Sequence, residues 1–229
     1  MQILSLETST ETGSCALLID GEVIERRCPA EQSHSTTLLP LVRQLLAEAS
    51  LSLAQLDAIA LGIGPGAFTG LRVACGAAQG LAVAANRPVV PVVSLAAMAA
   101  ATGGERVLAV LDARMGEVYA ARYVVMADRW QQQGEIQVLP PEQIDLPDAA
   151  GWQVCGNALS AYPTLAARVA AAGLSAQPGI LPLAAWVARL AVAPLAAGEA
   201  LDCGDIAPLY IRDKVAKTVA ERLAEGGRA

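Results

Sequence analysis

Hydrophobic and polar residues alternate near the start of the chain, with the two-residue period of a β-strand. The alternation covers residues 2–7 and returns at residues 14–19 and 22–28. Asp20-Gly21 separates the last two segments, and such a pair commonly forms a two-residue hairpin turn. We therefore predict three strands, of which the last two form a hairpin.

Helical spacing follows, because apolar residues recur every three or four positions from about residue 35 to 49. Pro40 lies in the first turns, where a missing N–H costs little. After a short apolar strand at 57–61, a glycine-rich segment leads into a second helix at 69–85. A strand at 88–93 and an alanine-rich helix capped by Ser94 are predicted next.

The pattern then restarts with a strand at 107–111 that ends in Asp112, a turn at 113–116 and a strand at 117–125. The openings L-S-L-E-T-S-T and L-A-V-L-D-A-R share one plan, which predicts a duplicated α/β architecture with a cleft between its halves. Residues 126–150 are polar and proline-rich and are predicted to be a connection. Helices are predicted at 158–172 and 183–197, the second ended by Gly198, followed by an ordered segment at 205–212 and a charged tail.

Composition places the chain among globular proteins. Its 229 residues suffice for one large or two small domains, and much of its 54% hydrophobic content is alanine. We expect no membrane span, because no run of about 18 residues is purely apolar. We expect no secretory signal, because the start lacks a basic region. Five cysteines without a C-x-x-C pair predict a reduced, cytosolic protein.

Charge and histidine content narrow the function classes. The net charge of −6 argues against strong binding of a polyanion by this chain alone, although a basic partner could supply that binding. His34 is the single histidine, which excludes a zinc site built from several histidines. A surface or helix-start position is the simpler interpretation of His34.

The segment G-I-G-P-G-A-F-T-G-L-R at residues 62–72 could present backbone N–H groups to an anion. No acid follows at the end of the next strand, so a dinucleotide site is rejected, and no Gly-Lys-Ser/Thr follows, so a P-loop is rejected. A tight strand-to-helix turn is the simpler interpretation.

Two acids at predicted strand ends, Glu7 and Asp112, could face a common cleft and hold a metal–nucleotide. Serine, threonine and glutamate are also ordinary turn residues, which is the simpler interpretation. The candidate cleft residues are Glu7, Thr8, Ser9, Thr10, Gly64, Gly66 and Asp112.

The helices at 35–49 and 69–85 have unusually broad apolar surfaces, and the second is small and apolar nearly all round. Burial of such a helix on every side requires either a second subunit or cover from the same chain. The first option predicts a helical interface that Leu45→Glu or Ala78→Arg would abolish without unfolding the chain. Its expected residues are Leu38, Leu41, Val42, Leu45, Phe68, Leu71, Arg72, Cys75, Ala78 and Leu81.

Several stretches together resemble one family. M-Q-I-L-S-L-E-T-S-T, E-Q-S-H, G-I-G-P-G-A-F-T-G-L-R, L-D-A-R-M-G-E-V-Y-A-A-R-Y and L-Y-I-R-D-K-V-A are similar to the bacterial TsaB family, formerly YeaZ. The resemblance runs almost end to end and is densest over residues 1–125. It implies an ASKHA-type α/β fold, as in actin and sugar kinases, with two duplicated lobes of mixed sheets flanked by helices. Residues 1–103 would be the lobe with the dimerisation helices and 104–229 the second lobe, whose last helix or tail packs back on the first.

The resemblance also implies a function. The family member is a non-catalytic scaffold in the complex that forms N6-threonylcarbamoyladenosine at position 37 of tRNAs reading codons that start with A. It pairs with TsaD through its first two helices, forms a homodimer when alone, and TsaE docks on the TsaB–TsaD pair. Contact with tRNA is expected mainly through the complex, in the cytoplasm. No intrinsic cofactor is expected, and ATP or ADP at the complex interface stays open.

The resemblance further implies that the metal site is missing. TsaD-type chains carry H-x-x-x-H on the helix after the first hairpin, whereas here Leu38 follows four residues after His34. Glu7 stands where active ASKHA enzymes have an aspartate facing phosphate, which leaves residual nucleotide contact open. The competing hypothesis is an autonomous ATP-dependent kinase of small molecules. A metallopeptidase lacks its ligands.

Overall fold

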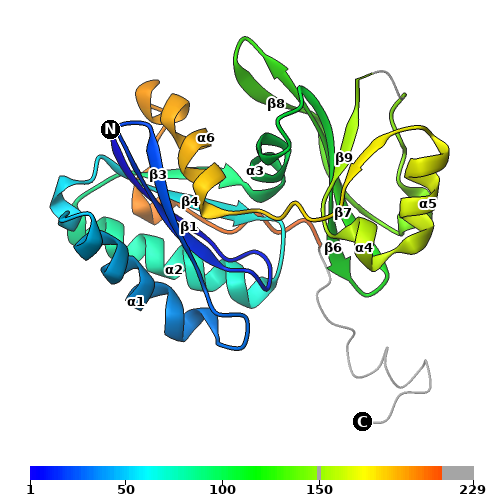
Figure 1. Cartoon of the computed structure of the whole chain (residues 1–229). Helices are drawn as coiled ribbons and strands as arrows, with labels where there is room; N and C mark the ends of the chain where they lie inside the picture. The colour runs from blue at the N-terminus through cyan, green and yellow to red at the C-terminus, as the bar shows by residue number, and fades with distance from the viewer. Residues whose placement is uncertain (149–150, 213–229) are drawn as a thin grey trace.

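The computed structural model describes residues 1–148 and 151–212, which form two five-stranded sheets (Figure 1). In the first sheet, β1 pairs antiparallel with β2 and parallel with β4. Its strands in spatial order are β3 (Glu22–Arg27), β2 (Ser14–Ile19), β1 (Gln2–Glu7), β4 (Ala58–Gly64) and β5 (Val89–Val93). The predicted hairpin and all five strand positions are confirmed.

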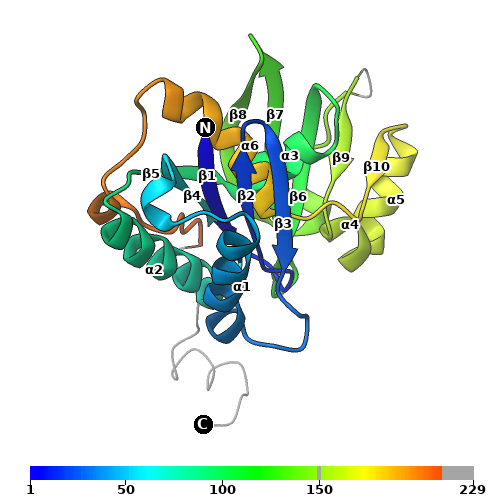
Figure 2. The same ribbon diagram turned by 60° about the vertical axis from the view of Figure 1, so that its left-hand side comes forward.

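Both faces of the first sheet are covered by helices. On one face lie α1 (His34–Glu48) and α2 (Phe68–Ala85) (Figure 2). The first helix contributes buried leucines to the core and the second contributes mainly buried alanines. On the other face, α6 (Ala184–Ala196) packs Val187, Ala188 and Ala191 against β1, β4 and β5. The first sheet is therefore completed by a helix from late in the chain.

The second sheet has the same number of strands and is also mixed. The helices α4 (Ala158–Ala161) and α5 (Pro163–Ala171) pack on one face, and α3 (Ser94–Ala101) packs on the other. Its strands in spatial order are β10 (Ser175–Gln177), β9 (Gln153–Cys155), β6 (Arg106–Arg114), β7 (Glu117–Met126) and β8 (Arg129–Leu139). Three short 3-10 helices lie at Leu53–Gln55, Pro141–Gln143 and Cys203–Asp205.

The predicted α/β class, with two mixed sheets flanked by helices, is confirmed. The prediction of residues 126–150 as a connection is wrong, because they contain β8, the longest strand. β8 is an edge strand whose side chains are mostly exposed, so its polarity hides the strand period. β9 and β10 were also not predicted, and each is only three residues long.

Residues 201–212 form a segment, here named the C-terminal strap, that contains the last 3-10 helix and joins the two halves. Leu201 pairs with Val89, and Ile206 is buried beside α2. Further along, Ile211 packs against the second sheet and Arg212 forms an ion pair with Glu117 of β7. The predicted boundary after residue 103 lies between α3 and β6. The tail from Asp213 lies outside the described residues.

Among the described residues, α2 alone is long and apolar enough to cross a membrane by length and composition. In the fold, its inner residues pack on the first sheet, including Leu71, Ala74 and Ala78.

Candidate functional site

Glu7, the acid at the end of β1, is completely buried and fully hydrogen-bonded. Its Oε1 accepts a hydrogen bond from the backbone N–H of Ser9 at 2.6 Å, and its Oε2 accepts one from the Ser94 hydroxyl at 2.7 Å. The Ser94 hydroxyl in turn accepts a hydrogen bond from the backbone N–H of Gly64 at 3.1 Å. Ser94 is the first residue of α3, and its side chain binds Glu7 instead of capping the helix, so the predicted cap is wrong.

The glycine loop receives the backbone that follows β1. A Cβ on Gly62 would collide with the Glu7 carboxylate, and a Cβ on Gly70 would collide with the carbonyl oxygen of Thr8. The Thr8 hydroxyl donates to the carbonyl of Gly70 at 2.7 Å, and the Ala67 N–H donates to the carbonyl of Ser9 at 2.7 Å. These glycines therefore permit close packing of two protein segments, in the space where an anion would lie.

Burial raises the pKa of Glu7, and the hydrogen bonds from Ser94 and Ser9 oppose that effect only in part. The side chain has no open face toward a ligand, because Gly62 and Ser94 enclose it. The prediction that Glu7 and Thr8 face a nucleotide cleft is corrected here, since both are buried within the chain. Gly64 is also buried, under the Leu71 side chain.

A small pocket remains between the halves, with a volume of about 90 Å³. Ser9, Thr10, Gly66, Asp112 and Asn157 contribute to its lining, so the fold does bring four of the seven predicted cleft residues together there. Pockets that hold drug-sized ligands usually measure about 300–1,000 Å³. This pocket is therefore much smaller than the usual site of a nucleotide-sized ligand.

Asp112 is occupied by protein contacts. Its carboxylate accepts hydrogen bonds from the Arg114 N–H at 2.9 Å and the Tyr162 hydroxyl at 2.8 Å. Burial, followed by the contact with Asp112, raises the pKa of Tyr162 to about 12. The Arg114 guanidinium also forms an ion pair with Glu11, so it links the turns after β1 and β6. These contacts join the two halves of the molecule.

His34 begins α1, and its ring contacts the protein backbone. Its Nε2 lies 2.9 Å from the carbonyl oxygen of Thr10. Within residues 1–148 and 151–212, no group of three or more His, Cys, Asp and Glu side chains could hold a metal ion.

The predicted interface on α1 and α2 needs a correction for six of its ten residues. Leu38, Val42, Leu45, Leu71, Cys75 and Ala78 are buried within this chain. The reason is that the first sheet itself covers the inner sides of both helices. Leu45→Glu or Ala78→Arg would therefore disrupt the core, and the expectation that the fold survives them is wrong.

The outward side of these helices is a different set of residues. Val83 is 68% exposed, Leu39 is 45% exposed and Phe68 is 38% exposed. Gly76 and Gly80 lie between them on α2, and a Cβ on either would meet no atom within 4 Å. Arg72 is exposed, whereas Leu41 and Leu81 are half-buried. We name the outward side of α1 and α2, with Leu39, Phe68, Arg72, Gly76, Gly80 and Val83, the α1/α2 face.

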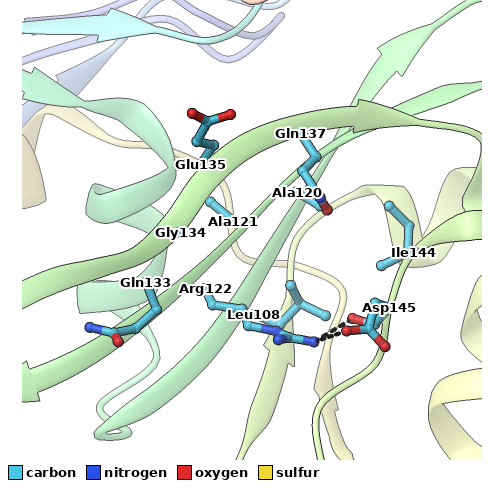
Figure 3. Close-up of a pocket in the computed structure, with 10 residues that line it drawn as sticks. All are labelled: Leu108, Ala120, Ala121, Arg122, Gln133, Gly134, Glu135, Gln137, Ile144 and Asp145. Carbon is cyan, nitrogen blue, oxygen red and sulfur yellow. Dashed lines mark hydrogen bonds and ion pairs between the residues drawn. The ribbon is translucent and has the colours of Figure 1, made fainter.

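A second pocket, of about 190 Å³, lies against the second sheet and was not predicted (Figure 3). Arg122 of β7 crosses it and donates to Asp145 at 2.7 Å (Figure 3). Gln133 and Glu135 of β8 line its outer part. Because the arginine is already paired, the pocket offers no free cation for an anionic ligand.

Comparisons with known proteins agree on one family. Residues 28–218 match the family model of TsaD, tRNA N6-adenosine threonylcarbamoyltransferase. The tRNA threonylcarbamoyladenosine biosynthesis proteins TsaB of Haemophilus influenzae and Escherichia coli K12 are 36% and 37% identical. Each alignment covers 94% of this chain, with 95% and 96% of the relative.

Solved structures give the same answer. YeaZ from Pseudomonas aeruginosa has a TM-score of 0.80 and 38% identity, covering 92% of this chain and 99% of that chain. A second P. aeruginosa structure, described as an uncharacterised protein similar to peptidase YeaZ, has a TM-score of 0.82 over the same shares. The similarity extends over nearly the full length of the chain in both sequence and fold, and is not limited to one motif. We conclude that the chain belongs to the TsaB (YeaZ) family of TsaD-related proteins.

Proposed function

We propose that this chain serves the formation of threonylcarbamoyladenosine on tRNA as a non-catalytic subunit that binds and activates TsaD. The family membership supports the pathway, because the E. coli and H. influenzae relatives carry that role in their names. Position 37 of tRNAs that read codons starting with A is the expected site of modification.

The packing around Glu7 supports a non-catalytic role. A catalytic acid must reach its substrate, but Glu7 is enclosed by Gly62 and Ser94. Asp112 is likewise engaged by Arg114 and Tyr162. The acids that would define an active ASKHA cleft therefore serve to join segments of this chain.

The α1/α2 face supports the binding role and is the observation that carries the proposal. Gly76 and Gly80 leave the backbone of α2 open on its outward side, between the exposed side chains of Phe68 and Val83. Small residues in such a row let a second helix approach closely, and apolar neighbours gain from burial. TsaD is the proposed occupant, and a second copy of this chain would occupy the face when TsaD is absent.

The remaining partners follow from the same assembly. TsaE would dock on the pair, and tRNA would be held mainly by the other subunits, since this chain carries a net charge of −6. ATP or ADP would bind at a border between subunits, because the pocket between the two halves of this chain measures only about 90 Å³. Four of the five cysteines are buried free thiols, in keeping with a cytoplasmic protein.

Reconstitution of the tRNA modification with and without this chain tests the role. We expect the product to require this chain when TsaD, TsaE and the adenylate-forming enzyme are present. Unchanged product formation in its absence would contradict the proposal. Isolated chain mixed with Mg·ATP should show no turnover, and rapid turnover would instead support the kinase hypothesis.

Substitutions on the exposed face test the binding surface. Val83→Arg should leave the thermal unfolding of the chain unchanged, and Gly80→Arg should not lower it, because both positions are exposed and arginine is a better helix former than glycine. Each should weaken co-elution with TsaD from a sizing column. Ala167→Arg, at an exposed position on α5, is the matched control and should co-elute normally. Equal co-elution of all three variants would show that the face is assigned wrongly.

A further inference from the structure

Arg72 is held in a fixed geometry by two aromatic side chains. It lies four residues after Phe68 on α2, so both side chains project from the same side of the helix. The centre of its guanidinium lies 3.8 Å from the centroid of the Phe68 ring. Its Nε donates a hydrogen bond to the hydroxyl oxygen of Tyr210 at 3.1 Å. The ring centroids of Phe68 and Tyr210 are 5.5 Å apart, which completes the cluster.

The C-terminal strap fixes the position of Tyr210. The N–H of Leu209 donates to the carbonyl of Ile63 at 2.8 Å, and Ile206 is buried beside α2. On the other side, Arg212 pairs with Glu117 of the second sheet. Tyr210 is therefore anchored on both sides, although its own side chain is 47% exposed.

The charge of Arg72 is not matched within the described part of the chain. No carboxylate in residues 1–148 and 151–212 lies within 4.0 Å of its guanidinium nitrogens. The Nη1 and Nη2 atoms form the end of the guanidinium that binds carboxylates in a two-pronged manner. A guanidinium held by a ring and a hydroxyl loses less conformational entropy on pairing than a free side chain does.

We propose that Arg72, positioned by Phe68 and Tyr210, binds a carboxylate of the protein that docks on the α1/α2 face and so selects that partner. The inference rests on the proposed function, because it names a specificity determinant of the same surface. Arginine and aromatic side chains are enriched among the residues that contribute most of the binding free energy in protein interfaces.

A protein carboxylate fits the site better than an RNA phosphate. The arginine is continuous with the α1/α2 face, whose exposed Val83 and bare glycines suit a packed helix and not a sugar–phosphate backbone. The chain also carries a net charge of −6, which repels a polyanion. An acidic side chain on a protein partner meets a single unmatched cation without that repulsion.

The test measures the affinity of the full-length chain for purified TsaD from the same organism, by calorimetry at several salt concentrations. Arg72→Ala should weaken binding by roughly 10- to 100-fold, as expected for a charged hydrogen bond lost at an interface. Arg72→Lys should recover only part of the loss, because lysine lacks the fork and the planar stack. Tyr210→Phe, which keeps the ring and removes the hydroxyl, should cost a few-fold.

The salt dependence of binding and two control variants test whether the loss of affinity comes from the charge of Arg72. The salt dependence of the wild-type affinity should decrease in Arg72→Ala. Arg106→Ala, which removes an exposed cation on the second sheet, should bind like the wild type. Asp213→Asn should also bind like the wild type if the carboxylate belongs to the partner.

Three results would overturn the proposal. They are wild-type affinity in Arg72→Ala, full recovery by lysine, and a loss in Asp213→Asn that matches the loss in Arg72→Ala. Loss of tRNA binding by the assembled complex, with TsaD affinity unchanged, would assign Arg72 to a phosphate and also overturn it. If the wild-type chain itself fails to bind TsaD, the proposed function fails instead.

Discussion

Glu7 occupies the position of an active-site acid in the sequence, but in the structure its side chain stabilises the fold. Its carboxylate is hydrogen-bonded to Ser9 and Ser94, which lie on two different elements. Removal of either donor would leave a buried acceptor with one partner fewer, which commonly costs about 1–3 kcal/mol. The residue therefore links the end of β1 to the start of α3.

The raised pKa of Glu7 predicts a pH-dependent stability. The folded protein binds the proton more tightly than the unfolded chain, because burial disfavours the charged form. Between about pH 4.5, the ordinary value, and the pKa in the fold, the unfolding free energy should therefore fall as the pH rises. This contribution is fully present below pH 4.5 and is lost above the pKa of the folded state.

Glu7→Gln isolates that effect, since glutamine has the same shape and carries no charge. The variant should gain stability relative to the wild type as the pH rises, by about 1.4 kcal/mol for every pH unit across the window. Urea unfolding of both proteins at a series of pH values measures the difference. A difference that stays constant with pH would show that Glu7 titrates normally in the fold.

At the scale of one element, α2 has one glycine near its start and another near its end that have opposite roles. Gly70 faces the loop after β1, where a Cβ would collide with the carbonyl oxygen of Thr8. Gly80 faces outward into open space. The same residue type is thus required by packing at one position, while at the other it costs helix stability and leaves the backbone accessible.

Alanine at these two glycines should therefore have opposite effects on stability. Gly70→Ala should destabilise the fold by about 1–3 kcal/mol, the usual cost of overpacking. Gly80→Ala should stabilise it by about 0.5–1 kcal/mol, because alanine is the better helix former. Urea midpoints of the two variants measure this. Stabilisation by both substitutions would mean that the loop after β1 moves away easily.

The same helix shows what the sequence could and could not predict. Its position and length follow from apolar spacing and from the glycine loop before it, and they were predicted to within one residue. Its inner and outer sides were not, because alanine and glycine occupy both and carry no polarity signal. Only the structure shows which side β4 and β1 bury, and it places three predicted contact residues of this helix, Leu71, Cys75 and Ala78, in the interior.

Sequence also failed where a contact joins distant segments. Tyr210 contacts Phe68 and Arg72 only because the strap runs back along α2. The residues around Tyr210 in the sequence do not predict this contact. The Ser94 hydroxyl likewise had a local use as a helix cap, which a buried carboxylate from β1 outcompetes. The sequence therefore predicted where each motif lies along the chain. It could not predict which distant residues contact the motif, because those contacts depend on the topology of the fold.

At the scale of the whole molecule, the two halves of the sequence are not two independent packing units. One face of the first sheet is covered by α6, which enters after the second sheet is complete. The serines of β1 and β2 hold its start, since Ser5 donates to the carbonyl of Ala184 at 2.7 Å and the N–H of Ala184 donates to Ser14 at 2.8 Å. The strap then returns along α2 and reaches β7.

This interleaving predicts that residues 1–103 will not fold by themselves. Without α6, the fragment would expose the sheet face that includes Ile3, Leu18 and Val90, all buried in the full chain. Loss of that burial removes much of the apolar driving force of a small sheet. The full chain should instead unfold in one cooperative transition, followed by circular dichroism and by tryptophan fluorescence. A cooperative thermal transition in the isolated fragment would show that the predicted boundary separates two independent folding units. It would also show that the first sheet folds without α6.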